Sequence, residues 1–249
     1  MRLKTLGGVQ VEGGRVTRPK PLLLLAYLAM EGPVSRRQVA ELFFPTAADP
    51  RDSLVTDLRY LRKHLGSGVG TDDSRLSTVL PCDAVDLLAD FDAYRYGKVV
   101  ERYEGSFFEG LGLDLGIELE EWLFGTKEVL ARRCRAAHFH RAHAALQRSD
   151  LRSARTEAEA GVAVRGGPEL DEHEIATVLP VLELTDSAVA LEVKALAAEL
   201  ELPHAHRTRW STRSSRSSTR CSSDWNTGQH RRVTRCLSAL TDLLREVIG

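Results

Sequence analysis

The residues best suited to do chemistry lie on one face of the stretch from Pro50 to Leu65. Leucines recur in this stretch at positions 54, 58, 61 and 65, and at about 100° per residue they form one buried stripe of a helix. The face opposite the stripe and its two flanks carry mostly polar and charged side chains: Arg51, Asp52, Val55, Thr56, Arg59, Tyr60, Arg62 and Lys63. Groups of these kinds contact the base edges and phosphates of nucleic acids.

A solvated helix face with ordinary surface charges has the same pattern, so the neighbouring sequence must decide. Asp49 and Pro50 are suited to open the helix, and Ser35 is suited to cap a shorter helix before it, with Gln38 in the position of a capping box. Arg36 and Arg37 follow this cap, where a helix N-terminus favours a phosphate. Two short helices joined by a proline-bounded loop predict a helix-turn-helix.

The sequence also predicts the secondary structure on either side of this helix pair. Residues 1–17 alternate weakly around glycine pairs, which predicts short strands, and the apolar run from Leu22 to Met30 predicts a deeply buried helix. The glycine-rich stretch 66–70 follows a helix and lacks the lysine of a phosphate loop, which favours a flexible connector. Polar and apolar residues alternate over 74–80, as in one strand of a hairpin. Arg75 and Thr78 on this strand are suited to contact a DNA backbone, and an ordinary surface strand is the alternative interpretation.

Charge is strongly segregated along the chain, although the net charge is only −1. Counting Lys and Arg against Asp and Glu gives +5 for residues 1–70, −12 for 71–203 and +6 for 204–249. The basic head suits a polyanion, whereas DNA would repel the acidic middle. We therefore expect the middle to face away from DNA and to serve a partner or a regulatory role.

Composition narrows the class of protein. The 249 residues are 43% hydrophobic and 6% aromatic, which suits a helix-rich protein of one large or two modest domains. The longest apolar run is too short for a membrane span and lacks the order of a signal peptide, so we expect a cytoplasmic protein with no membrane contact. The four cysteines are far apart and form no CxxC pair, which predicts reduced thiols and no zinc site.

Two clusters in the middle region invite an enzymatic interpretation. Glutamates at 118, 120 and 121 open a predicted helix, where the helix dipole favours negative charge without any catalytic role. Histidines at 138, 140 and 143 do not share a close helical face and are better interpreted as surface residues than as metal ligands. Because no HExxH, GxSxG or GxxxxGK[ST] motif occurs, we expect no catalysis, cofactor or metal.

The order of these segments resembles a known family. TRPKPLLLLAYLAMEGPVSRRQVAELFFP, DSLVTDLRYLRKHLG and the predicted hairpin resemble the winged-helix head of bacterial transcriptional activators of the antibiotic-regulatory-protein class. VDLLADFDAYRYGKVVERYEGSFFEGL and IELEEWLFGTKEVLARR resemble the entry to the tetratricopeptide-like bacterial transcriptional activator domain of that family. The likeness spans about residues 1–203, and its specific signal is the order of motifs that are individually degenerate.

The resemblance implies roles for several parts of the chain. The helix around residues 50–65 would enter the major groove, the hairpin at 74–85 would contact the minor groove or backbone, and the loop from Phe44 to Asp49 would face RNA polymerase. The acidic helical region would mediate formation of a homodimer or binding of another partner.

The last segment differs in character from the rest. From Arg207 to Arg235, Ser, Thr and Arg dominate and apolar residues are scarce, which predicts a disordered tail. Such a tail either adds nonspecific DNA affinity or is an unselected sequence, and the helical module is shorter here than the resemblance implies.

These observations lead to one preferred organisation. We expect a mainly α protein with a winged-helix domain at 1–85, a tetratricopeptide-like helical domain at 86–203 and a Ser/Arg-rich tail at 204–249. The preferred function is that of a transcriptional regulator that binds duplex DNA sequence-specifically, and we expect it to be an activator. The rivals are a helical adaptor whose basic head binds an acidic protein and, more remotely, a hydrolase built on the acidic region.

Overall fold

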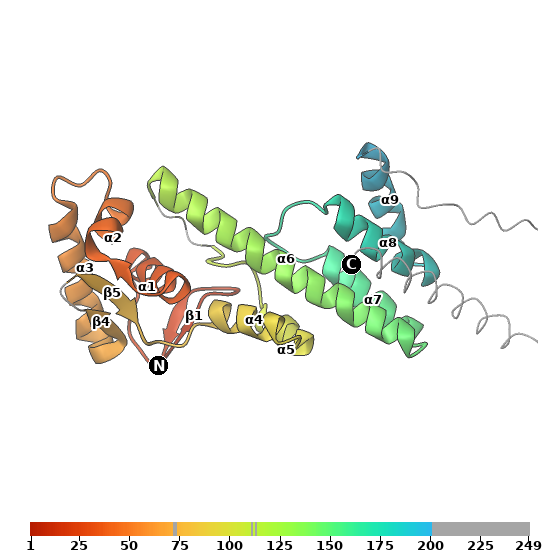
Figure 1. Cartoon of the computed structure of the whole chain (residues 1–249), viewed down its shortest axis with the longest axis horizontal. Helices are drawn as coiled ribbons and strands as arrows, with labels where there is room; N and C mark the ends of the chain where they lie inside the picture. The colour runs from red at the N-terminus through yellow and green to blue at the C-terminus, as the bar shows by residue number, and fades with distance from the viewer. Residues whose placement is uncertain (72–73, 111, 113, 201–249) are drawn as a thin grey trace, which may run out of the picture. The chain divides into compact units, whose positions relative to one another are not determined.

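The computed structural model describes residues 1–71, 74–110, 112 and 114–200, which form a mainly helical fold with small sheets near the N-terminus (Figure 1). The expected mainly α class is therefore confirmed. The predicted disordered tail at 204–249 lies outside the described residues.

The chain begins with a two-stranded antiparallel ribbon and a buried helix. Strand β1 (Arg2–Lys4) pairs with β2 (Gln10–Glu12), so that Leu3 lies opposite Val11. Helix α1 (Pro19–Glu31) begins at a proline, which suits a first helical turn, and ends before Gly32 at a φ of 74°. Every residue of α1 from 21 to 28 is buried, which confirms that this helix is the core of the head.

Two further helices form the expected helix-turn-helix pair. Strand β3 (Val34–Ser35) leads into α2 (Arg36–Phe43), and α3 (Pro50–Leu65) follows after a short loop (Figure 1). Ser35 Oγ accepts a hydrogen bond from Gln38 N at 3.1 Å, which is one half of the predicted capping box. Asp49 Oδ1 accepts from Arg51 N at 2.8 Å and from Asp52 N at 3.1 Å, so Asp49 caps α3 as predicted.

A hairpin completes the head as a wing. Strands β4 (Val69–Thr71) and β5 (Arg75–Thr78) are antiparallel, and β5 also pairs with β3 in a three-stranded sheet of order β3-β5-β4. The expected flexible connector at 66–70 is wrong, because Gly66–Gly68 form a 3-10 turn (η1) and β4 begins at Val69. The Gly68 carbonyl accepts from Thr78 Oγ1 at 2.9 Å and from Val79 N at 3.3 Å, and these bonds order the segment.

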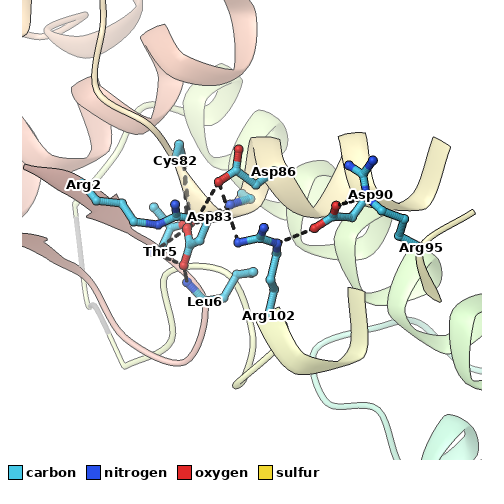
Figure 2. Close-up of polar contacts among 10 residues, drawn as sticks. Arg2, Thr5, Leu6, Cys82, Asp83, Asp86, Asp90, Arg95 and Arg102 are labelled. Atoms are coloured by element: carbon cyan, nitrogen blue, oxygen red, sulfur yellow. Dashed lines mark hydrogen bonds and ion pairs between the residues drawn. The ribbon is translucent and has the colours of Figure 1, made fainter. Parts of the chain in front are cut away.

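The next two helices are joined to the N-terminal ribbon by buried charge. Helix α4 (Asp83–Asp92) carries three aspartates, at 83, 86 and 90, that point toward arginines and backbone amides, and α5 (Tyr96–Arg102) supplies one of these arginines, Arg102 (Figure 2). The carboxylate of Asp83 is buried and accepts from Thr5 N at 2.8 and 2.9 Å, from Leu6 N at 3.1 Å and from Thr5 Oγ1 at 2.5 Å. A buried carboxylate needs such donors, and here they fix β1 against α4.

The core of the head extends well beyond the wing. Phe107, Phe108 and Leu119 are buried in the same hydrophobic cluster as Leu3 and the leucines of α1 and α3. Phe108 N donates to Thr5 O at 2.9 Å, which holds this segment against the N-terminal ribbon. Residues 1–138 and 163–169 accordingly form one compact unit.

A second compact unit comprises, among the described residues, 139–162 and 170–200, and the long helix α6 (Ile117–Gln147) contributes to both units. The described helices of this unit are α7 (Leu151–Val162), α8 (Glu172–Leu184) and α9 (Val189–Glu199), close to the ranges of about 151–164, 172–184 and 186–200 that the sequence predicts. A cluster of alanine, valine and leucine side chains from α6 to α9 forms its core. The domain limits at residues 85 and 203 stay predictions.

Candidate nucleic-acid interface

A basic groove lies where α2, α3 and the wing meet. It encloses about 540 Å³ and is lined by three arginines, two serines and two apolar side chains: Ser35, Arg36, Arg37, Arg51, Leu54, Val55 and Ser74. Three arginines from two helices thereby line one concave site. Such an arrangement suits the oxygens of a phosphate group, which guanidinium binds with paired N–H donors.

Backbone pairing sets the shape of this groove. Ser35 lies opposite Arg75 in the β3–β5 pair, and Arg36 N donates to Ser74 O at 2.9 Å. The wing is therefore fixed against the first turn of α2. The sequence predicted Arg36, Arg37, Arg51 and Val55, but it missed Ser35, Leu54 and Ser74 as lining residues, because only the nonlocal strand pairing brings the serines together.

Arg37 has an intramolecular partner that water can reach. Its Nε donates to Glu41 Oε1 at 2.8 Å, one turn along α2, and this hydrogen bond raises the pKa of Arg37. Both side chains are well exposed. An exposed pair of this type is weak and screened by salt, so Arg37 can exchange this partner for an anion.

The leucine stripe of α3 is confirmed, since all four leucines are buried. On the remaining surface Val55 and Tyr60 are half-buried, and the other predicted residues are exposed: Arg51, Asp52, Thr56, Arg59, Arg62 and Lys63. Within residues 1–200 as described, no ion pair engages Arg51, Arg59 or Lys63. Thr56 Oγ1 donates to Asp52 O at 3.0 Å, a bond within the helix.

Tyr60 has a role that the sequence did not indicate. Its hydroxyl accepts a hydrogen bond from Thr17 N at 3.0 Å, and the Arg18 guanidinium lies 4.5 Å from its ring centroid. The hydrogen bonds from Thr17 lower the pKa of Tyr60. Tyr60 thus ties α3 to the segment before α1, and its hydroxyl already has a partner before any ligand arrives.

The two predicted wing residues differ in their exposure to solvent. Arg75 is exposed at the start of β5, beside the groove. Thr78 is half-buried, and its hydroxyl donates to Gly68 O and lies 3.3 Å from Leu80 N, whose hydrogen bond it accepts. Val79, which is 72% exposed, is an outward wing residue that the sequence pattern did not indicate.

Histidines and cysteines outside the groove are the other candidates for chemistry, and of the three predicted surface histidines only His140 is exposed, whereas His138 and His143 are half-buried. Among the described residues, no group of three or more His, Cys, Asp and Glu side chains could hold a metal ion. Cys82 and Cys134 are buried reduced thiols, and burial raises the pKa of Cys82 to about 11, which makes it a poor nucleophile. None of the helices in the described ranges combines the length and hydrophobicity that crossing a bilayer requires.

A groove lined by three arginines thus lies beside the polar face of α3 and the β4–β5 hairpin. Comparisons with family models and with curated protein sequences find no match to this chain.

Proposed function

We propose that this protein is a sequence-specific regulator of transcription that binds duplex DNA through its head. The observation that carries the proposal is the groove in which Arg36, Arg37 and Arg51 converge beside the exposed face of α3. A phosphate of the DNA backbone would occupy this groove, and α3 would lie in the major groove.

The exposed face of α3 supports the part of the proposal that concerns base recognition. Arg59 and Lys63 are exposed one turn apart, and neither has an ion-pair partner in the described part of the chain. An unpaired arginine can form two hydrogen bonds to guanine in the major groove. Arg75 at the start of the wing would add a backbone contact.

The resemblance noted in the sequence supports the wider role. It favours an activator whose loop from Phe44 to Asp49 faces RNA polymerase and whose helical second unit mediates dimerisation. These partners belong to the proposal together with duplex DNA. A cytoplasmic location fits the same role.

Binding of the full chain to a duplex library, followed by titration of the selected site with salt, tests the proposal. Each phosphate contact that is lost should reduce the slope of log affinity against log salt by about 0.9. We expect Arg36→Gln, Arg37→Gln and Arg51→Gln together to flatten the slope by about two to three and to weaken specific and random DNA alike.

Matched control variants are available on the same chain. Lys98 and Arg148 are exposed cations on α5 and just beyond α6, outside the groove. Lys98→Gln with Arg148→Gln should leave both affinity and slope unchanged. If wild type selects no duplex and its affinity for DNA is insensitive to salt, the DNA-binding proposal fails and an adaptor that binds an acidic protein replaces it.

A further inference from the structure

The first two turns of α6 expose an unusual pair of apolar side chains. Ile117 is 76% exposed and Phe124 is 64% exposed. Seven residues of helix turn through about 700°, so the two side chains lie two turns apart on the same face. Glu120 and Glu121 lie on the turn between these two side chains, and we call the exposed pair Ile117 and Phe124 the apolar strip.

The opposite side of these turns is firmly anchored, so α6 cannot rotate to bury the strip. Leu119 is buried, and Trp122 Nε1 donates to Glu31 Oε1 at 2.7 Å. The Trp122 ring also meets Tyr27 edge to face at 4.9 Å. Ile117 and Phe124 are therefore exposed by the orientation of a fixed helix.

The strip continues onto the loop between α2 and α3. A Cβ built on Gly116 would come within 2.7 Å of Pro45 Cγ, so the loop lies directly against the start of α6 (Figure 1). Pro45 is itself exposed. On the inner side of the loop, Lys20 Nζ lies 4.6 Å from the ring centroid of Phe44, which holds the loop in place.

Charge indicates what kind of partner fits. The stretches 44–49 and 114–125 contain five acidic residues and no Lys or Arg. Asp49 is used as the cap of α3, but Glu118, Glu120 and Glu121 are exposed around the apolar strip. We call the surface made by Pro45, Ile117, Phe124 and these three glutamates the acidic–apolar face.

We propose that the acidic–apolar face binds a basic amphipathic helix of a partner protein. A helix of this kind places apolar anchors at spacings of three, four and seven residues, and the spacing of seven matches Ile117 and Phe124, while its Lys and Arg side chains meet the glutamates. Duplex DNA is repelled by the same glutamates. A second copy docking through the same face would oppose acid with acid.

A synthetic amphipathic helix of leucine and lysine, labelled for fluorescence anisotropy, serves as the probe for the full chain. Ile117→Ala with Phe124→Ala should weaken its binding at least about tenfold, because apolar anchors dominate such interfaces. Glu118→Gln, Glu120→Gln and Glu121→Gln together should reduce the salt dependence of binding. All five side chains are exposed, so thermal melting should show an intact fold.

The matched control lies on α9, where Leu191 is 73% exposed next to Glu192. Leu191→Ala with Glu192→Gln should leave peptide affinity unchanged. Equal loss in this control, or no loss in the double variant at Ile117 and Phe124, overturns the proposal.

Two further readouts separate the remaining outcomes. Residues 204–249 carry a charge of +6, and if deleting them raises peptide affinity about tenfold, this chain and not a partner supplies the occupant, which overturns the proposal. DNA binding by the variants of the acidic–apolar face should equal that of wild type. If wild type binds the peptide as expected but selects no DNA, only the proposed DNA-binding function fails.

Discussion

The basic groove and the joint between β1 and α4 use the same residue types in opposite ways. In the joint, Asp86 and Asp90 form ion pairs with Arg2, Arg95 and Arg102 at 2.5 to 3.8 Å (Figure 2). In the groove, three arginines line one concave site with no carboxylate among the lining residues, and Arg37 pairs only with the well-exposed Glu41 outside that lining. Charges that are satisfied internally stabilise the fold, whereas a concentration of cations without lining anions is suited to an external anion.

The largest expected effect concerns where the head ends. A fragment of residues 1–85 lacks Phe107, Phe108 and Leu119, which are fully or almost fully buried in the core of the head. It also loses the bond from Phe108 N to Thr5 O. We expect this fragment to be unfolded by circular dichroism and to bind no DNA, because the loss of three such side chains exceeds the stability of a small domain.

A fragment of residues 1–169 retains every segment of the first unit and is the matched comparison. It should melt cooperatively and keep the DNA affinity of the head. Cooperative unfolding of the 1–85 fragment would show instead that the winged helix is independent of α4, α5 and α6.

The next largest effect is expected at Asp83. Asp83→Ala leaves Thr5 N, Thr5 Oγ1 and Leu6 N without their acceptor in a buried site. Each unsatisfied donor costs about 1 to 3 kcal/mol, so the free energy of unfolding should fall by roughly 4 kcal/mol. Urea denaturation measures this, with Asp92→Ala at the exposed end of α4 as the control. Equal stability of the two variants would contradict a structural role for the joint.

The contribution of Asp90 to the stability of the joint should depend on pH. Burial opposes ionisation of Asp90, but hydrogen bonds from Arg102 and Arg95 outweigh it and lower its pKa. A lowered pKa in the folded state contributes stability above the pKa of the unfolded chain, about 4, and this contribution is lost as pH falls through the folded value. Asp90→Asn removes the charge of one partner in a buried ion pair, which should cost about 3 kcal/mol at neutral pH, and the cost should become smaller as the pH falls below about 4. A constant difference between pH 7 and pH 2 would exclude this origin.

Local sequence patterns predicted most helices of the head, whereas they did not predict the contacts between residues far apart in sequence. The spacing of four leucines was sufficient to orient α3, and Asp49 and Ser35 marked the helix starts, because periodicity and capping depend on neighbouring residues. Three other contacts join residues that are far apart in sequence. They are the hydrogen bond from Thr17 to Tyr60, the hydrogen bond from Thr5 to Asp83 and the close approach of Gly116 to Pro45. No local pattern encodes such pairs.

The smallest expected effect compares two arginines of α3. Arg59 points away from the leucine stripe, where a paired contact to guanine is worth roughly 1 to 3 kcal/mol of discrimination, whereas Arg62 lies nearer the flank. Arg59→Ala should therefore weaken the selected site more than random DNA and relax preference at one or two base pairs. Arg62→Ala should weaken both by a similar factor, or lower the melting temperature if its stem supports the fold. Affinities for selected and random duplexes, measured beside thermal melting, distinguish these outcomes. Uniform weakening of both duplexes by Arg59→Ala, with an unchanged melting temperature, would mean that α3 meets DNA through a different face.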